Sequence, residues 1–217
     1  MQDIKSYTLW NGVTPKAISS STDATPIVIT TSSSHGYSTG DFVQIFGHTT
    51  NVAANGIYKI TVLTATTFSL QNLNTGANIA GSGGGAGSGG VVVTAPKIAM
   101  SGDFDSAVIE VGTSGTATMT LKVVASQGVV GQAETQHGDT PNFGATQSAT
   151  NPWDYVQLVQ LSDNDSIDGS TGVVISASDL VGKLYEVNIN KVKYLTALIT
   201  SWTQGAIYAK LTLYKHN

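Results

Sequence analysis

Asp41-Phe-Val-Gln-Ile-Phe-Gly47 and Asn55-Gly-Ile-Tyr-Lys-Ile-Thr-Val62 are the two stretches that decide the fold of this chain. Each is a short run rich in β-branched and aromatic residues, which pack well on a pleated sheet. Glycine and the Asn-Gly pair both tolerate the positive φ angles of tight turns. The two stretches therefore predict short β-strands whose ends are set by turns at Gly47 and Asn55-Gly56.

Similar runs recur along the chain between turn residues, and helical periodicity is hard to find, which is the pattern of an all-β protein. A closed barrel is the natural arrangement for such short strands, because closure leaves no strand edge unpaired. We therefore predict a small β-barrel of about five strands in the first half of the chain, at residues 26–31, 41–46, 56–63, 67–71 and 90–94.

The strand pattern in the second half of the sequence predicts an antiparallel, jelly-roll-like β-sandwich. Alternation is clearest at the end of the chain, where Ile207, Ala209, Leu211 and Leu213 fall on one face of a strand. We expect eight strands, at residues 97–100, 107–111, 117–124, 154–161, 172–176, 184–188, 194–199 and 205–214.

Three parts follow from these patterns: an extended N-terminal arm at residues 1–23, the barrel module at 24–94 and the β-sandwich domain at 95–217. The arm has too few apolar residues to fold alone, so we expect it to be ordered only in an assembly. Whether the barrel is inserted into the sandwich or precedes it stays open.

The charge composition argues against nucleic-acid binding. Charged residues make up 11% of the chain, the formal net charge is −4 and all ten basic residues are Lys. A phosphate-binding surface needs a basic patch, and base recognition relies on the bidentate guanidinium group of Arg. Within residues 24–94 only Asp41 and Lys59 are charged. The barrel is therefore expected to bind through shape and neutral hydrogen bonds.

The chain contains no Cys, which excludes disulfides, thiolate metal sites and cysteine nucleophiles. No apolar run reaches the length of a membrane span, and Met-Gln-Asp-Ile-Lys-Ser at the start does not resemble a secretion signal. We expect a soluble protein that is not exported by the usual signal route and does not bind a membrane.

No common hydrolase or nucleotide-binding signature occurs, so we predict no catalytic residue and no cofactor. Residues 163–169 (Asp-Asn-Asp-Ser-Ile-Asp-Gly) could offer oxygen ligands to calcium, but their spacing differs from an EF-hand and we favour a solvated turn. His35 and His48 could be imagined as metal ligands, yet a His in a turn more often bonds to backbone. We therefore predict no metal site.

Two long segments have open interpretations. The run Gly81-Ser-Gly-Gly-Gly-Ala-Gly-Ser-Gly-Gly90 is either a flexible hairpin loop, which we favour, or closely packed backbone at an interface. The irregular residues 127–152 form a long loop of the kind that is often functional or interfacial.

Aromatic residues supply the candidate interface. Trp153 and Trp202 flank predicted strands, and Tyr155 follows Trp153 closely. Trp10 lies in the predicted arm with no local core to join. We predict that Trp10, Trp153, Tyr155 and Trp202 contact a partner, because large aromatic side chains dominate interface energetics.

The barrel region resembles a known module. Thr30-Thr-Ser-Ser-Ser-His-Gly-Tyr-Ser-Thr-Gly-Asp41 precedes the first stretch quoted above, and Thr66-Thr-Phe-Ser-Leu70 follows the second. Together they resemble a small β-barrel of tailed-bacteriophage structural proteins, a module similar to the first catalytic-cysteine half-domain of ubiquitin-activating enzymes. The cysteine chemistry does not transfer, because this chain has no Cys. The segments Asn151-Pro-Trp-Asp-Tyr-Val156 and Tyr194-Leu-Thr-Ala-Leu-Ile-Thr-Ser-Trp202 also look like phage virion proteins.

This resemblance implies a non-enzymatic structural protein of a phage virion, with capsid decoration or another head-associated role as the favoured function. The implied partners are the major capsid protein or other virion proteins. We also expect a homo-oligomer, with a trimer as the first candidate because such proteins often occupy threefold axes. The alternative is a tail-associated or receptor-binding module that recognises host-surface glycans through the loops near Trp153 and Tyr155.

Overall fold

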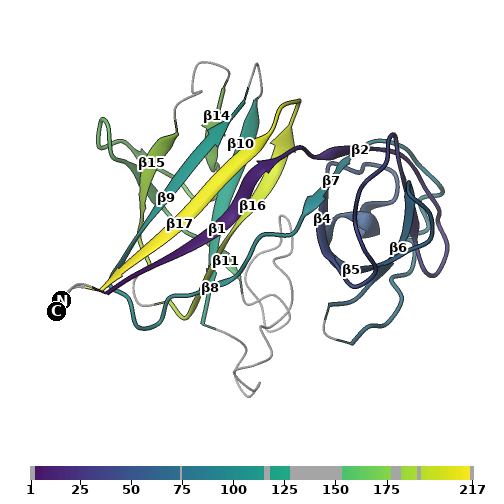
Figure 1. The fold of residues 1–217 in the computed structure, drawn as a ribbon, viewed down its shortest axis with the longest axis horizontal. Coiled ribbons are helices and arrows are strands. Elements are labelled where there is room, and N and C mark those ends of the chain that lie inside the picture. The colour runs from purple at the N-terminus through teal and green to yellow at the C-terminus, as the bar shows by residue number, and fades with distance from the viewer. Residues whose placement is uncertain are drawn as a thin grey trace. The chain divides into compact units, whose positions relative to one another are not determined.

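A computed structural model describes residues 3–73, 75–114, 118–127, 153–176, 182–189 and 192–215. The fold is all-β, as predicted, and the chain divides into two compact units (Figure 1). One unit is Pro15–Ala95, and the other combines Met1–Thr14 with Pro96–Asn217. The barrel is therefore an insertion into the sandwich, which answers the question that the sequence left open.

The inserted unit is a closed barrel of six antiparallel strands in the order β2-β3-β6-β5-β4-β7. The five predicted strands are present, and the sixth, β2, comes from residues that we assigned to the arm. It pairs with β3 on one side and with β7 on the other, so it closes the barrel. The strands are β2 (Lys16–Ser21), β3 (Val28–Thr31), β4 (Phe42–Phe46), β5 (Gly56–Val62), β6 (Thr67–Gln71) and β7 (Val91–Thr94), with a short 3₁₀ turn η1 (Val52–Ala54) between β4 and β5.

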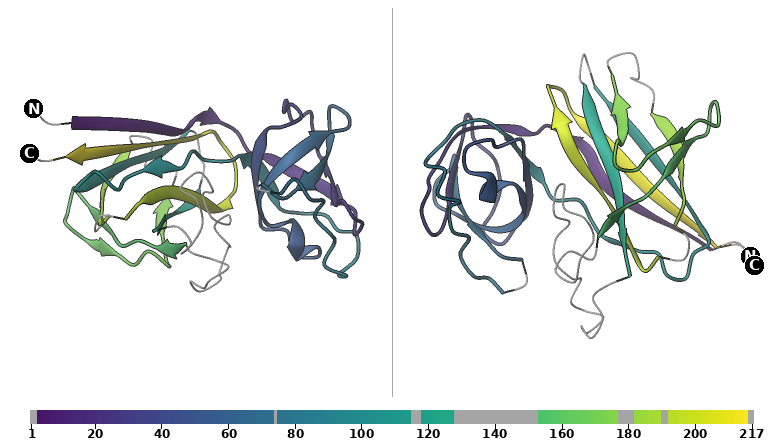
Figure 2. Two further views of the ribbon diagram at one scale, coloured as in Figure 1. Left: turned by 90° about the horizontal axis from the view of Figure 1, so that it is seen from below. Right: turned by 180° about the vertical axis from the view of Figure 1, so that it is seen from behind.

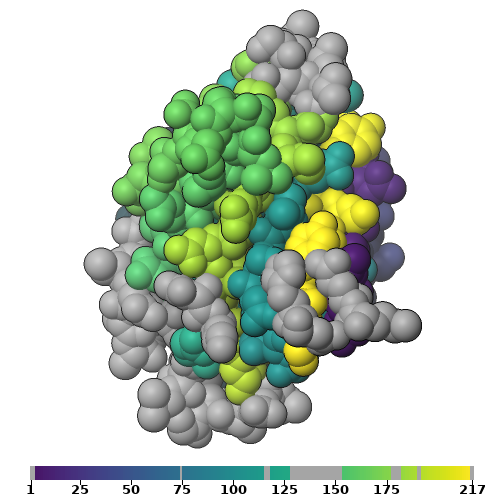
Figure 3. All heavy atoms as spheres, turned by 90° about the vertical axis from the view of Figure 1, so that its left-hand side faces the viewer, coloured from purple at the N-terminus to yellow at the C-terminus, as the bar shows by residue number. Residues whose placement is uncertain are grey.

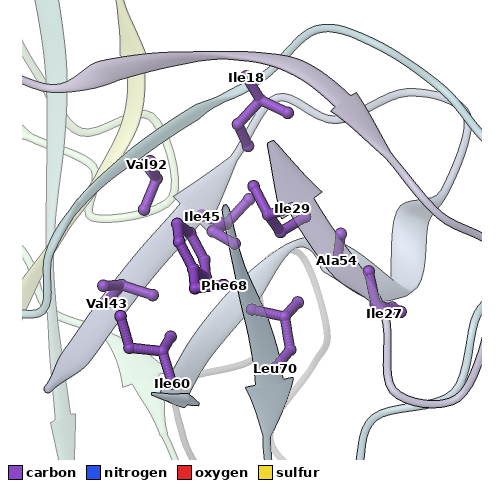
Figure 4. Packing of buried hydrophobic residues seen from close by; sticks show 10 residues of the cluster. All are labelled: Ile18, Ile27, Ile29, Val43, Ile45, Ala54, Ile60, Phe68, Leu70 and Val92. Atoms are coloured by element: carbon purple, nitrogen blue, oxygen red, sulfur yellow. The ribbon is translucent and has the colours of Figure 1, made fainter. Parts of the chain in front are cut away.

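The barrel interior is filled by aliphatic side chains around Phe68, with every strand contributing at least one (Figure 4). Alternate residues of a strand point to opposite faces, so each short strand supplies only one or two core side chains. The cluster is Ile18, Ile27, Ile29, Val43, Ile45, Ala54, Ile60, Phe68, Leu70 and Val92.

The second unit is a sandwich of two antiparallel sheets. The larger sheet has the order β1-β17-β9-β15-β12-β13, and the other has the order β11-β10-β16-β8 with β14 also paired to β10. The strands are β1 (Asp3–Val13), β8 (Ala99–Met100), β9 (Ser106–Thr113), β10 (Met119–Ser126), β11 (Asp154–Tyr155), β12 (Leu158–Gln160), β13 (Ser166–Ile167), β14 (Val173–Ile175), β15 (Lys183–Val187), β16 (Tyr194–Trp202) and β17 (Ile207–Lys215).

Eight of these strands have the connectivity of a jelly roll. In chain order they are β1, β8, β9, β10, β14, β15, β16 and β17, and we number them 1 to 8. The larger sheet contains them in the order 1-8-3-6, and the other sheet in the order 2-7-4-5, which is the strand order of a jelly roll. The predicted alternation holds in β17, where Ile207, Ala209, Leu211 and Leu213 are all buried. The sequence analysis found seven of the eight strands, and β1 is the one that it missed.

The predicted N-terminal arm is wrong for residues 3–13, because these residues form β1 and pair with β17 along their whole length (Figure 2). Two irregularities in the register, between Thr8 and Trp10 and between Asn11 and Val13, interrupt the alternation of β1. They place the consecutive residues Leu9 and Trp10 both in the core. Such a strand has no regular period-two pattern, so the sequence gives little sign of it.

Residues 154–161 were predicted as one strand, but the chain changes sheets within them. Asp154 and Tyr155 pair with β10 of one sheet, and Leu158 to Gln160 pair with β15 of the other. We call residues 154–158 the crossover segment. Residues 153–176 form one continuous side of the sandwich surface, drawn in green in Figure 3.

Candidate functional site

Two of the four predicted interface residues are already buried within their own unit. Trp10 is 2% exposed and Trp153 is 3% exposed, so neither ring is available to a partner in this conformation. The prediction for these two residues is therefore wrong as stated. For Trp10 the cause is the irregular register of β1, which turns its side chain into the sandwich core.

Tyr155 and Trp202 are half-buried and do not share a surface. In the register of β10, Trp202 pairs with Met119 and Tyr155 pairs with Val124, near opposite ends of the strand. The indole N–H of Trp202 donates a hydrogen bond to the carbonyl oxygen of Gly205 at 3.0 Å, in the turn between β16 and β17. Trp202 therefore has a local structural role, whereas Tyr155 lines a hollow.

The hollow at Tyr155 lies beside the crossover segment and has a volume of about 500 Å³. Polar groups surround it, and its lining includes Asp154, Tyr155, Gln157, Ser166, Asp168 and Ser170. The ammonium group of Lys122 lies 4.9 Å from the centroid of the Tyr155 ring. A cation at this distance interacts with the face of the ring, so that face is occupied.

Asp168, on the edge of this hollow, is also engaged by its own neighbours. Its carboxylate accepts hydrogen bonds from the hydroxyl and from the backbone N–H of Ser170. These bonds, with a smaller contribution from the positive charge of Lys122, lower the pKa of Asp168. The Asp154 carboxylate accepts from the backbone N–H of Tyr155 at 2.8 Å, and the side-chain amide of Gln157 donates to the hydroxyl of Ser166. The polar side chains of this hollow are therefore engaged with one another and with nearby backbone.

Asp163 and Gly169 lie in turns, as predicted, but Ser166 and Ile167 between them form the short strand β13, which the prediction of a single turn did not include. Asp163 accepts hydrogen bonds from the side chain of Gln160 (2.7 Å) and the backbone N–H of Asp165 (3.1 Å). Asn164, at φ 64°, takes the left-handed conformation of the turn between β12 and β13. Among the described residues no three His, Cys, Asp or Glu side chains are grouped as metal ligands.

Both barrel histidines bond to backbone. The Nδ1 atom of His35 accepts from the N–H of Tyr37 at 2.9 Å, and its Nε2 atom lies 3.1 Å from the carbonyl oxygen of Thr64. The Nδ1 atom of His48 accepts from the N–H of Asn51 at 3.2 Å. Burial lowers the pKa of His48, and its Nε2 atom has no partner within the described part of the chain. Both residues therefore stabilise turns, as their positions in the sequence indicated.

The glycine run is packed against the barrel, contrary to the flexible loop that we favoured. The carboxylate of Asp23 accepts from the N–H groups of Gly83 (3.2 Å) and Gly85 (2.9 Å). At Gly84, a Cβ atom would lie 2.4 Å from the carbonyl oxygen of Thr50, so only glycine fits there. The backbone of the glycine run is therefore closely packed, but against residues of its own barrel. The alternative interpretation had placed this packing at an interface.

One further hollow was not predicted from the sequence. It lies on the outer face of the six-stranded sheet, has a volume of about 650 Å³ and includes Thr8, Asn11, Glu110, Gly112, Tyr208 and Lys210 in its lining. We call it the Tyr208 groove. These residues come from β1, β9 and β17, so only the strand register brings them together.

The predicted loop at residues 127–152 lies outside the described residues except for Gln127. In the described part of the chain, helical structure is limited to the three residues of η1, and no helix has the length or apolar character of a membrane span.

Comparison with protein-family models gave no match, and comparison with curated proteins gave none either.

Proposed function

We propose that this chain is a non-enzymatic structural protein of a phage virion, with capsid decoration or another head-associated role. The observation that supports the proposal most is the insertion of a complete barrel between β1 and β8 of a complete jelly roll. Each unit has its own core, so one can attach to the particle while the other is displayed. The resemblance of residues 30–70 to a phage barrel module agrees with this division.

The proposed partners are the major capsid protein or other virion proteins, together with further copies of this chain, as in a trimer. The barrel carries few charges, because the charged residues of Pro15–Ala95 are limited to Lys16, Asp23, Asp41 and Lys59. Its contacts would then depend on shape and neutral hydrogen bonds, and attachment would persist in high salt.

Cryo-electron microscopy of the intact particle tests this proposal. Density for the barrel and sandwich repeated over the icosahedral shell would support decoration and give the number of copies at each position. Density confined to the neck or the tail would overturn the head-associated role. Purified virions that lack the chain altogether would refute the structural role itself.

A second candidate function is recognition of host-surface glycans. Open polar hollows with a tyrosine in the lining favour it, because aromatic rings and hydrogen-bonding side chains are the groups that bind sugars. Titration of the full-length protein with cell-surface polysaccharide tests it. Saturable binding would support recognition, and a purely architectural protein would show none.

A further inference from the structure

The Tyr208 groove is built by two rows of residues that cross the larger sheet. In one row Asn11, Tyr208 and Gly112 are successive cross-strand neighbours on β1, β17 and β9. In the next row Lys210 pairs with Thr8 on one side and with Glu110 on the other. Cross-strand neighbours on one face lie close enough for their side chains to act on a common ligand.

Glycine keeps one side of the groove open. A Cβ atom on Gly112 would lie 3.5 Å from the Cα atom of Gly182 and would meet no atom of Tyr208 within 4 Å. The Tyr208 ring leans over β1 instead, where its hydroxyl would be 3.3 Å from a Cβ on Gly12. Among the described residues the space above Gly112 is therefore left free, and the Tyr208 ring, which is 43% exposed, forms a wall beside it.

The polar side chains of the groove have no side-chain partner among the residues that the structure describes. Within the described part of the chain, no hydrogen bond or ion pair holds the side chains of Thr8, Asn11, Glu110, Tyr208 or Lys210. Glu110 and Lys210 are cross-strand neighbours and still do not form an ion pair. In the Tyr155 hollow, by contrast, Lys122 covers the ring and Ser170 engages Asp168.

These groups define the chemistry of a ligand. Glu110 only accepts hydrogen bonds, Lys210 only donates them, and Thr8, Asn11 and Tyr208 can do both. The two charges cancel, and a carboxylate in the lining disfavours phosphate or another anion. A volume of about 650 Å³ is in the range of small-molecule sites.

We propose that the Tyr208 groove binds a neutral saccharide, with a sugar ring against Tyr208 above Gly112 and its hydroxyl groups bonded to Asn11, Glu110 and Lys210. Sugar hydroxyls donate and accept hydrogen bonds, which suits this mixed set of side chains. The apolar face of a sugar ring suits the exposed ring of Tyr208. This inference rests on the second candidate function, glycan recognition, and assigns its site to a place that the sequence did not indicate.

Isothermal titration of the full-length protein with neutral trisaccharides of glucose, galactose, mannose and N-acetylglucosamine tests the proposal. Tyr208→Ala removes the wall of the groove. Gly112→Ala adds a methyl group to the open side without removing any polar group, and the new Cβ would make only ordinary contacts. Tyr155→Ala is the matched control in the other hollow. Circular dichroism of each variant checks that it is folded.

We expect at least one trisaccharide to bind the wild-type protein, with a Kd that rises at least about tenfold in Tyr208→Ala and in Gly112→Ala. The Kd should stay within about twofold in Tyr155→Ala and between low and moderate salt, because the ligand is neutral. Binding that survives Tyr208→Ala, or that Tyr155→Ala removes, would overturn this site while glycan recognition stands. If no trisaccharide binds the wild-type protein, the proposed site is refuted, and the titration with cell-surface polysaccharide decides the second candidate function separately.

Discussion

The buried side-chain oxygen of Asn51 accepts two hydrogen bonds from Ser82, one from the backbone N–H at 3.2 Å and one from the hydroxyl at 3.1 Å. The side-chain amide of Asn51 donates to the carbonyl oxygen of Thr22 at 2.8 Å. Asn51 is 0% exposed, so water cannot replace these partners. One side chain thus joins the segment after β4, the end of β2 and the start of the glycine run.

Replacing Asn51 should therefore destabilise the barrel. In Asn51→Ala the carbonyl oxygen of Thr22 and the N–H of Ser82 lose their partner, and we expect a loss of about 2–3 kcal/mol in the free energy of unfolding. Hydrogen exchange of barrel peptides measures this, since all three Trp residues lie in the sandwich unit and their fluorescence does not report on the barrel. The control is Asn78→Ala, an exposed position where the change should stay within about 0.5 kcal/mol. Equal effects of the two variants would contradict the role of Asn51.

Substitutions at two neighbouring glycines should distinguish the energetic cost of a steric clash from the cost of an unfavourable backbone conformation. Gly84→Ala should cost about 1–3 kcal/mol, because the new Cβ meets the carbonyl oxygen of Thr50. Gly85→Ala has open space around it but sits at φ +86°, so it should cost about 1–2 kcal/mol from backbone strain alone. Hydrogen exchange of residues 16–21 and 81–90 measures both. A flexible run would show no loss in either variant, or a small gain from the reduced entropy of the unfolded chain.

The barrel should lose stability at mildly acidic pH because of His48. Burial lowers its pKa below the ordinary value of 6.5 that it regains on unfolding. The unfolded chain then binds the proton first, so the stabilisation is complete above pH 6.5 and is lost as the pH falls towards the folded-state pKa. One such group changes the free energy of unfolding by at most about 1.4 kcal/mol per pH unit.

His48→Asn tests this pH dependence. The Asn oxygen can accept the N–H of Asn51 in place of Nδ1 but does not titrate. The stability of the variant barrel, measured by hydrogen exchange between pH 7.5 and 5, should fall less steeply than that of the wild type. Identical slopes for the two proteins would show that His48 does not cause the effect.

In the full-length protein, Trp10→Ala should destabilise the sandwich unit by about 3–5 kcal/mol, since it empties a buried site. Urea unfolding followed by the fluorescence of Trp153 and Trp202 gives the value. Ile4→Ala lies on the same strand with 58% exposure and should change stability by no more than about 0.5 kcal/mol. If residues 3–13 were an arm ordered only in an assembly, both variants would unfold like the wild type.

The barrel strands could be predicted because their signals are local. Gly47 and the Asn55-Gly56 pair mark the ends of runs that are rich in β-branched and aromatic residues. β17 was found for the same reason, through Ile207, Ala209, Leu211 and Leu213. β1 and β2 were missed because register shifts beside Trp10 and after Ile18 break the alternation that identifies a strand.

The sequence by itself determined the all-β class, the barrel-plus-sandwich composition and the absence of cysteine and arginine chemistry, since each depends on local pattern or on composition. The tertiary structure alone decided that β1 closes the jelly roll, that Asp23 and Asn51 hold the glycine run and that Tyr208 stands beside an open patch over Gly112. These relationships join residues far apart in the chain, and they depend on strand register, which no local pattern encodes.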